Sequence, residues 1–117
     1  MINSWLVILV EGLAETIALA EAIGVDPERF LETIAGGPTG PAYAQLKGKM
    51  MIARKFDPAF SLALARKDAR LVLEAAERHG FDAALVEVVG RKMDEAIAAG
   101  HGDEDMAATF YASTAGR

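Results

Sequence analysis

Apolar residues recur along the chain with the period of an α-helix, in segments separated by glycine and proline. No alternating run of apolar and polar residues would form a convincing β-strand, and no internal repeat is present. The pattern therefore predicts an all-α domain, a bundle of about five to six helices. The predicted helices cover about residues 3–23, 27–36, 42–53, 61–78 and 82–99, and a short sixth helix opens at residues 103–105.

Local signals mark where these helices begin and end. Gly24 suits the left-handed turn that closes the first helix. Asp26 is expected to cap the second helix and Pro27 to occupy its first position, where the missing N–H costs nothing. Asp82 is expected to cap the fifth helix, and residues 103–105 place negative charge at the positive end of the sixth.

Composition narrows the class of protein. The 117 residues are 52% apolar and 25% charged, which fits one folded domain and excludes a disordered tail. The 17 acidic and 12 basic residues give a net charge of −5, which argues against a nucleic-acid binder. Because the chain has no cysteine, it has no disulfide framework, thiolate zinc site or cysteine nucleophile. We expect a soluble, cytoplasmic, single-domain protein that binds neither nucleic acid nor a membrane.

The first predicted helix is unusual because residues 5–10 are apolar on every side. This segment is too short to span a bilayer, and Glu11 and Glu15 follow it. No basic region of a secretory signal precedes it. One interpretation makes it the central helix of the bundle. The other is that this end is covered by something outside the chain, either a second domain or a second subunit.

The fourth predicted helix carries a carboxylate on an apolar face. Asp68 has Leu64, Ala65, Leu71 and Val72 as its neighbours three and four residues away. One interpretation is structural: Asp68 caps a neighbouring helix or pairs with an arginine, and Lys67 extends to solvent. The functional interpretation is a Lys67–Asp68 pair at a cleft, in which the ammonium group binds an anionic ligand.

Other polar features are weaker signals. The glycine-rich residues 36–40 follow a helix and no strand, so we interpret them as a connection and not as a phosphate-binding loop. His101 lies near an acidic cap, a poor ligand set for a metal, and we predict no metal site. Tyr43, Lys47 and Lys49 are interpreted, on their pattern alone, as ordinary surface residues.

Taken together, six segments resemble the C-terminal helical domain of the β-hydroxyacid dehydrogenases. This family includes 3-hydroxyisobutyrate dehydrogenase and, more distantly, 6-phosphogluconate dehydrogenase. The resemblance covers nearly the whole chain, and it rests on the order and spacing of the segments more than on any single motif. The segments are residues 3–6, 11–15, 20–26, 56–60, 67–71 and 100–105.

The resemblance implies a part of a two-domain enzyme. In the family, an N-terminal Rossmann domain binds NAD or NADP, and the helical domain closes the cleft over a small hydroxy acid or semialdehyde. The family's catalytic lysine lies four residues before an asparagine, which would be Asn3 here, so the lysine would precede Met1. The Gly-x-Gly-x-x-Gly unit of the Rossmann domain is absent from these 117 residues. We therefore expect residues 1–117 to be a single helical domain without dehydrogenase activity of its own.

The resemblance also assigns roles to residues of this chain. It implies that Asn3 acts in catalysis and holds the substrate, and that Tyr43 reaches toward the substrate. It implies that Lys67, Phe60 and Asp68 form the wall of the cleft that faces the cofactor. Helical domains of the family pack together, so a homodimer is expected. The alternative is a stand-alone helical dimerisation or ligand-binding module without redox activity.

Overall fold

A computed structural model of the chain describes residues 1–114 and contains six α-helices and no β-strand in that range. The predicted all-α bundle is therefore confirmed. Two further turns interrupt the α-helical order, a π-helical turn η1 (Ile97–His101) and a 3-10 turn η2 (Met106–Thr109). The α-helices are α1 (Ile2–Ala22), α2 (Pro27–Ile34), α3 (Ala42–Ala53), α4 (Leu62–Arg78), α5 (Ala84–Ala96) and α6 (Phe110–Thr114).

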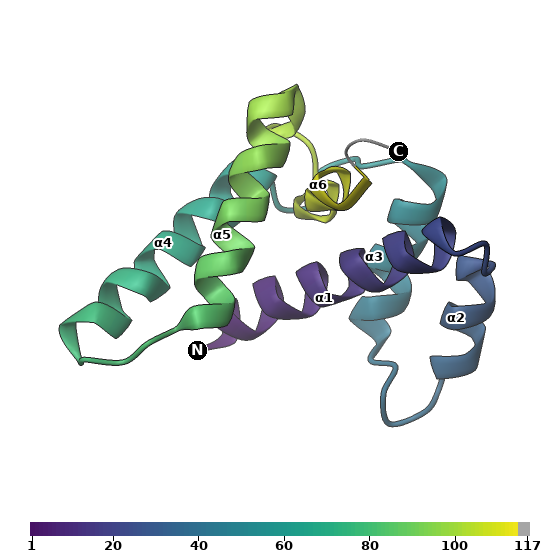
Figure 1. Cartoon of the computed structure of the whole chain (residues 1–117), viewed down its shortest axis with the longest axis horizontal. Coiled ribbons are helices and arrows are strands. Elements are labelled where there is room, and N and C mark those ends of the chain that lie inside the picture. The colour runs from purple at the N-terminus through teal and green to yellow at the C-terminus, as the bar shows by residue number, and fades with distance from the viewer. Residues whose placement is uncertain (115–117) are drawn as a thin grey trace.

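Helix α1 is the central helix of the bundle. Figure 1 shows it crossing the molecule from the N-terminus, beside the start of α5, to α2 and α3. It contacts every other α-helix, and Val10, Ala14 and Ile17 on its inner face are fully buried. Its outer face is exposed. The prediction that a second domain or a second subunit covers this helix therefore applies to the outer face only.

Within the described residues, α1 alone is long and apolar enough to cross a membrane, judged by length and composition only. It has 21 residues with a mean hydropathy of 1.5. Residues 5–10 by themselves are too short to span a bilayer, but the whole of α1 is long enough. A core helix of a soluble protein meets the same criterion, and the inner face of α1 is packed in the bundle.

Of the two predicted side-chain caps, one forms and the other does not. The Asp26 carboxylate accepts a hydrogen bond from the Glu28 N–H at 3.0 Å, with Pro27 in the first turn of α2. The structure adds a cap that was not predicted: the Ser61 hydroxyl caps α4 by accepting from the Leu64 N–H at 3.2 Å. The predicted Asp82 cap is wrong, because α5 begins one residue later, at Ala84, and its N-terminus has no side-chain cap.

Two glycines shape the packing of the bundle. A Cβ atom at Gly48 would lie 2.8 Å from Cδ2 of Leu31, so the glycine allows α2 to pack directly on α3. Gly100 has a φ of +102°, a left-handed conformation that favours glycine, and it lies within the π-helical turn η1 that follows α5. Because of this turn, α5 ends at Ala96 and not at residue 99 as predicted.

Candidate functional site

The amino-terminal half of α4 presents an exposed apolar face with a lysine at its centre. Phe60, Leu64, Lys67 and Leu71 are spaced by four, three and four residues, so they share one side of the helix and its entry. Phe60, Leu64 and Leu71 are 36%, 50% and 49% exposed. Large apolar side chains grouped around a cation at the surface are typical of a binding face and not of a core.

Lys67 and Asp68 have no electrostatic partner within residues 1–114. Neither side chain forms an ion pair or a hydrogen bond, although Asp68 is half-buried. Arg66 binds Asp94 instead, with its Nε 2.7 Å from Oδ1. The structural interpretation, in which Asp68 caps a helix or pairs with an arginine, is therefore wrong. Both charged groups remain available to a ligand.

A buried ion pair fixes the loop that leads into α4. The Lys47 Nζ lies 2.9 Å from Oδ2 and 3.1 Å from Oδ1 of Asp105, and the two side chains are 2% and 0% exposed. The same carboxylate accepts hydrogen bonds from the N–H groups of Ala59, Phe60 and Ala107. One side chain thus joins α3, the loop before α4 and η2.

Backbone hydrogen bonds extend this connection along both loops. The Phe60 carbonyl accepts from the Met106 N–H at 2.8 Å, and the Leu62 N–H donates to the Glu104 carbonyl at 2.8 Å. The Asp105 N–H donates to the Phe56 carbonyl at 2.9 Å. The segment from Phe56 to Leu62 is therefore fixed on both sides of Asp105, and with it the position of the Phe60 ring and the start of α4.

The environment of Asp105 favours its charged form. Burial opposes ionisation, but hydrogen bonds from the Ala107 N–H, the Lys47 ammonium group and the N–H groups of Ala59 and Phe60 outweigh it. The pKa of Asp105 is held below its ordinary value as a result. The carboxylate therefore stays ionised at neutral pH and acts as a fixed structural anion.

Sequence reasoning missed this pair. Interpreting Lys47 as a surface residue was wrong, whereas Lys49 is exposed as expected. A signal was present, because Lys47 lies three residues after Ala44 and four before Met51, both of which are buried. Asp105 belongs to a run of three acidic residues, and the other two, Asp103 and Glu104, are more exposed than Asp105. No periodicity of the sequence indicates that Asp105 is the buried one.

Within residues 1–114, the two predicted substrate residues form no hydrogen bond with Phe60, Leu64, Lys67 or Leu71 of the α4 face. Asn3 is exposed in the first turn of α1, and Ser4 beside it lines a pocket with residues 81–86. Tyr43 on α3 is half-buried, and its hydroxyl donates to the Met106 sulfur at 3.5 Å. No hydrogen bond among the described residues links Asn3 or Tyr43 to Lys67.

His101 forms local contacts with Glu104 and Tyr111. Its Nδ1 contacts the Glu104 carboxylate, and its ring stacks on Tyr111 with 3.9 Å between the ring centroids. Across residues 1–114, no group of three or more His, Asp or Glu side chains is arranged to hold a metal ion.

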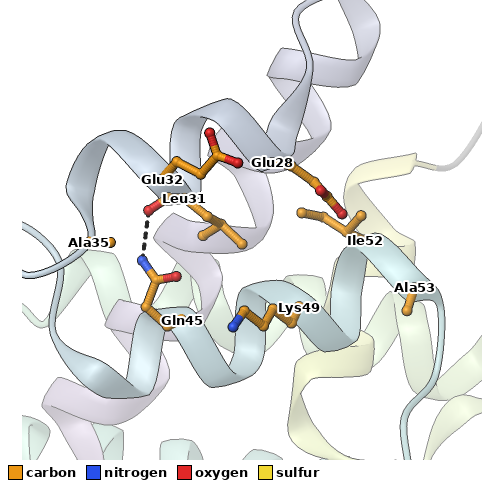
Figure 2. A pocket seen from close by; sticks show the side chains of 8 residues that line it. All are labelled: Glu28, Leu31, Glu32, Ala35, Gln45, Lys49, Ile52 and Ala53. Atoms are coloured by element: carbon orange, nitrogen blue, oxygen red, sulfur yellow. Dashed lines mark hydrogen bonds between the residues drawn. The ribbon is translucent and has the colours of Figure 1, made fainter.

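A separate pocket lies between α2 and α3, with a volume of about 530 Å³ (Figure 2). Leu31 and Ile52 form its apolar part, and the Gln45 amide donates to the Leu31 carbonyl at 2.8 Å. Glu32 and Lys49 lie at its edges. None of the residues assigned by the resemblance lines this pocket.

Comparison with known proteins identifies the family. Residues 1–112 match the family described as "NAD-binding of NADP-dependent 3-hydroxyisobutyrate dehydrogenase". The chain is 37% identical over 108 residues to the uncharacterized oxidoreductase YfjR of Bacillus subtilis, which covers 92% of this chain and 37% of that protein. It is 34% identical over 68 residues to the 2-hydroxy-3-oxopropionate reductase of Escherichia coli, which covers 58% of this chain and 23% of the enzyme.

Solved structures agree with this assignment. A 3-hydroxyisobutyrate dehydrogenase from Salmonella typhimurium superposes with a TM-score of 0.87 at 19% identity, over 93% of this chain and 38% of that one. The enzyme of Mycobacterium tuberculosis, solved with L-serine, gives a TM-score of 0.76 at 25% identity, over 93% and 40%. This chain therefore belongs to the family of NAD(P)-dependent hydroxyacid dehydrogenases and has the fold of their helical domain. It spans well under half the length of these relatives.

Proposed function

We propose that this chain is the helical part of an NAD(P)-dependent β-hydroxyacid dehydrogenase that acts on a small 3-hydroxy acid or semialdehyde. The observation that carries the proposal is Lys67, an unpaired cation at the centre of an exposed apolar face. The Escherichia coli relative is named as a reductase of 2-hydroxy-3-oxopropionate, a small semialdehyde acid, which supports this class of substrate.

The α4 face suits one side of a dinucleotide or of a short acid. The Lys67 ammonium group would bind a phosphate or carboxylate, and the apolar surface of Phe60 and Leu64 would pack against a ring or a short carbon chain. The bound cofactor would supply the hydride acceptor or donor at nicotinamide C4. The residues of this chain would orient it and exclude water from that side.

We propose that Asn3 positions the substrate at the other wall of the cleft. A side-chain amide donates and accepts hydrogen bonds at once, so it can hold a hydroxyl group that changes into a carbonyl group. Asn3 is exposed in the first turn of α1 and free to make such contacts. Tyr43 would act less directly, because its hydroxyl already donates to Met106.

The test joins residues 1–117 to the nucleotide-binding part of the Escherichia coli 2-hydroxy-3-oxopropionate reductase, in place of that enzyme's own helical part. In the joined protein, Lys67→Ala should lower kcat/KM for the NADPH-dependent reduction of 2-hydroxy-3-oxopropionate by about 10-fold to 100-fold, because a charged contact to an anion is lost. Lys67→Arg should keep part of the activity. Lys55→Ala, which removes an exposed lysine in the loop after α3, is the matched control and should leave the activity unchanged.

The alternative is a ligand-binding module without redox activity, and the pocket between α2 and α3 is the observation that favours it. Variants of the two sites separate the two functions. If Lys67→Ala has no more effect than Lys55→Ala in a joined protein that folds and binds NADPH, the α4 face is not the cofactor wall. A loss of activity in Lys49→Ala, at the edge of the pocket, would then make the pocket the better candidate.

A further inference from the structure

The pocket between α2 and α3 combines an apolar floor with charged side chains on both of its walls (Figure 2). Its volume of about 530 Å³ lies in the range of small-molecule sites. Helix α2 contributes Glu28 and Glu32, one turn apart, and α3 contributes Lys49. The pocket is separate from the α4 face, because none of the residues that we propose contact cofactor or substrate lines it.

Packing between the two helices fixes the floor of this pocket. Leu31 of α2 is 4% exposed and packs on α3 at Gly48, where a Cβ atom would lie 2.8 Å from Cδ2 of Leu31. The Gln45 amide donates to the Leu31 carbonyl at 2.8 Å and joins the helices at one end of the pocket (Figure 2). Ile52 of α3 extends the apolar surface toward the other end. A pocket held in this way can bind a ligand with little loss of conformational freedom.

The charged side chains of the pocket have no partner within residues 1–114. Glu28, Glu32 and Lys49 form neither an ion pair nor a hydrogen bond through their side chains. Figure 2 shows the Glu28 carboxylate toward the Ile52 end of the pocket and the Lys49 ammonium group turned toward Gln45. Opposite charges therefore face the same apolar floor from two helices without reaching each other.

We propose that this pocket binds a small zwitterion with an apolar body, of the class of the α-amino acids with large apolar side chains. The ammonium group of the ligand lies toward the carboxylates of α2, and its carboxylate lies toward Lys49. Its side chain covers Leu31 and Ile52. The inference stands apart from the proposed redox function, because its site and its test involve neither the cofactor nor a hydroxy acid.

The charges of the pocket favour a zwitterion over other small ligands. An apolar anion would pair with Lys49 but would meet two carboxylates on the facing helix. An apolar cation would find partners on α2 but would be repelled by Lys49. A neutral apolar molecule would take water away from charged groups and give them no partner in return. A molecule with both charges satisfies both walls.

The first experiment titrates the isotope-labelled chain with L-phenylalanine and follows the backbone amide shifts by NMR. We expect saturable shifts confined to α2 and α3, with a Kd of about 1 mM, the affinity typical of a ligand with about 12 non-hydrogen atoms. Two analogues test the charges of the ligand. Phenethylamine, which lacks the carboxylate, and hydrocinnamate, which lacks the ammonium group, should each bind about 3-fold to 10-fold more weakly.

The second experiment assigns each charge of the ligand to one wall. Lys49→Gln should weaken L-phenylalanine by about 3-fold to 10-fold but should not weaken phenethylamine, which has no carboxylate to lose a contact. The double variant Glu28→Gln, Glu32→Gln should weaken L-phenylalanine to a similar extent but should not weaken hydrocinnamate. Lys55→Gln and Glu77→Gln, which remove exposed charges of the same two signs outside the pocket, are the matched controls.

Three outcomes would overturn the proposal. They are the absence of saturable shifts up to about 20 mM L-phenylalanine, equal binding of L-phenylalanine and its two analogues, and a loss of affinity in Lys49→Gln no larger than that in Lys55→Gln. Circular dichroism of each variant confirms that a loss of binding is not a loss of fold. A joined protein without dehydrogenase activity would contradict the proposed function and would leave this binding measurement unaffected.

Discussion

Lys47 and Asp105 form an ion pair that is sealed from solvent, with Nζ 2.9 Å from Oδ2. A buried pair of this kind requires the remaining lone pairs to be satisfied, and here three backbone N–H groups satisfy them. Two of those N–H groups, from Ala59 and Phe60, belong to the loop that leads into α4. The pair therefore connects the interior of the bundle to the face that we propose contacts the cofactor.

Removing the Asp105 carboxylate should strongly destabilise the fold. We expect Asp105→Ala to lower the free energy of unfolding by about 3–5 kcal/mol, because Lys47 would be left buried without a partner. Urea denaturation measures this value. Asp103→Ala, two residues away and exposed, should change it by less than about 0.5 kcal/mol.

The same pair makes stability depend on pH at the acid end. The pKa of Asp105 is lower in the folded state than in the unfolded state. Its contribution is therefore complete above the unfolded pKa and is lost as the pH falls through the folded value. Wild-type protein should lose stability steeply in acid relative to Asp105→Ala. Parallel acid-unfolding curves of the two proteins would contradict this role.

Glu11 should produce a pH dependence of the opposite sign. Burial raises its pKa to about 7, because it opposes ionisation more than the Thr109 hydrogen bond and the charge of Lys92 favour it. One carboxyl oxygen, Oε2, has no hydrogen-bond partner among the described residues. The folded state thus binds a proton that the unfolded state releases, so the contribution of Glu11 to stability is complete below about pH 4.5 and is lost as the pH rises through about 7.

The size of this effect follows from the shift in pKa. At about 1.4 kcal/mol for each pKa unit, the wild-type protein should lose up to about 3 kcal/mol of stability between about pH 5 and about pH 8. Glu11→Gln should remove most of that loss, and Glu15→Gln, an exposed neighbour one turn away, should not. Urea denaturation at the two pH values, at one protein concentration, measures the difference. If Glu11→Gln loses as much stability between the two pH values as the wild-type protein, another group is responsible for the pH dependence.

Gly48 should be replaceable only if Leu31 is made smaller. Alanine favours a helix by about 1 kcal/mol over glycine, but its Cβ would lie 2.8 Å from a methyl carbon of the buried Leu31. We expect Gly48→Ala alone to destabilise by about 1 kcal/mol, since overpacking outweighs propensity. In a Leu31→Val background the same substitution should be neutral or stabilising. A double-mutant cycle with no coupling energy would contradict this account of α2–α3 packing.

Much of the fold could be predicted from the sequence because the helices are bounded by strong local signals. Asp26, Pro27 and Ser61 lie at helix starts, and glycines lie at the ends. The errors occur where tertiary contacts decide the outcome. Asp82 lies outside α5, and a π-helical turn that no periodicity indicates takes the place of the last predicted residues of that helix.

The candidate site could be predicted only in part. The assignment of Phe60, Lys67 and Asp68 to the site follows from the resemblance, and it stays a prediction. In the structure Phe60 and Lys67 are exposed and Asp68 is half-buried. The buried pair beneath them could not be predicted, because its members are 58 residues apart and only folding brings them together. Lys47 shows that a lysine between apolar neighbours on a short helix can be a buried ion and not a surface residue.

The most direct test of the account compares this chain alone with the chain joined to the nucleotide-binding part of the Escherichia coli reductase. The measurement is the oxidation of NADH and NADPH in the presence of 2-hydroxy-3-oxopropionate. We expect no turnover by the chain alone and substrate-dependent turnover by the joined protein. Turnover by the chain alone, or none by a joined protein that folds and binds NADPH, would contradict the account.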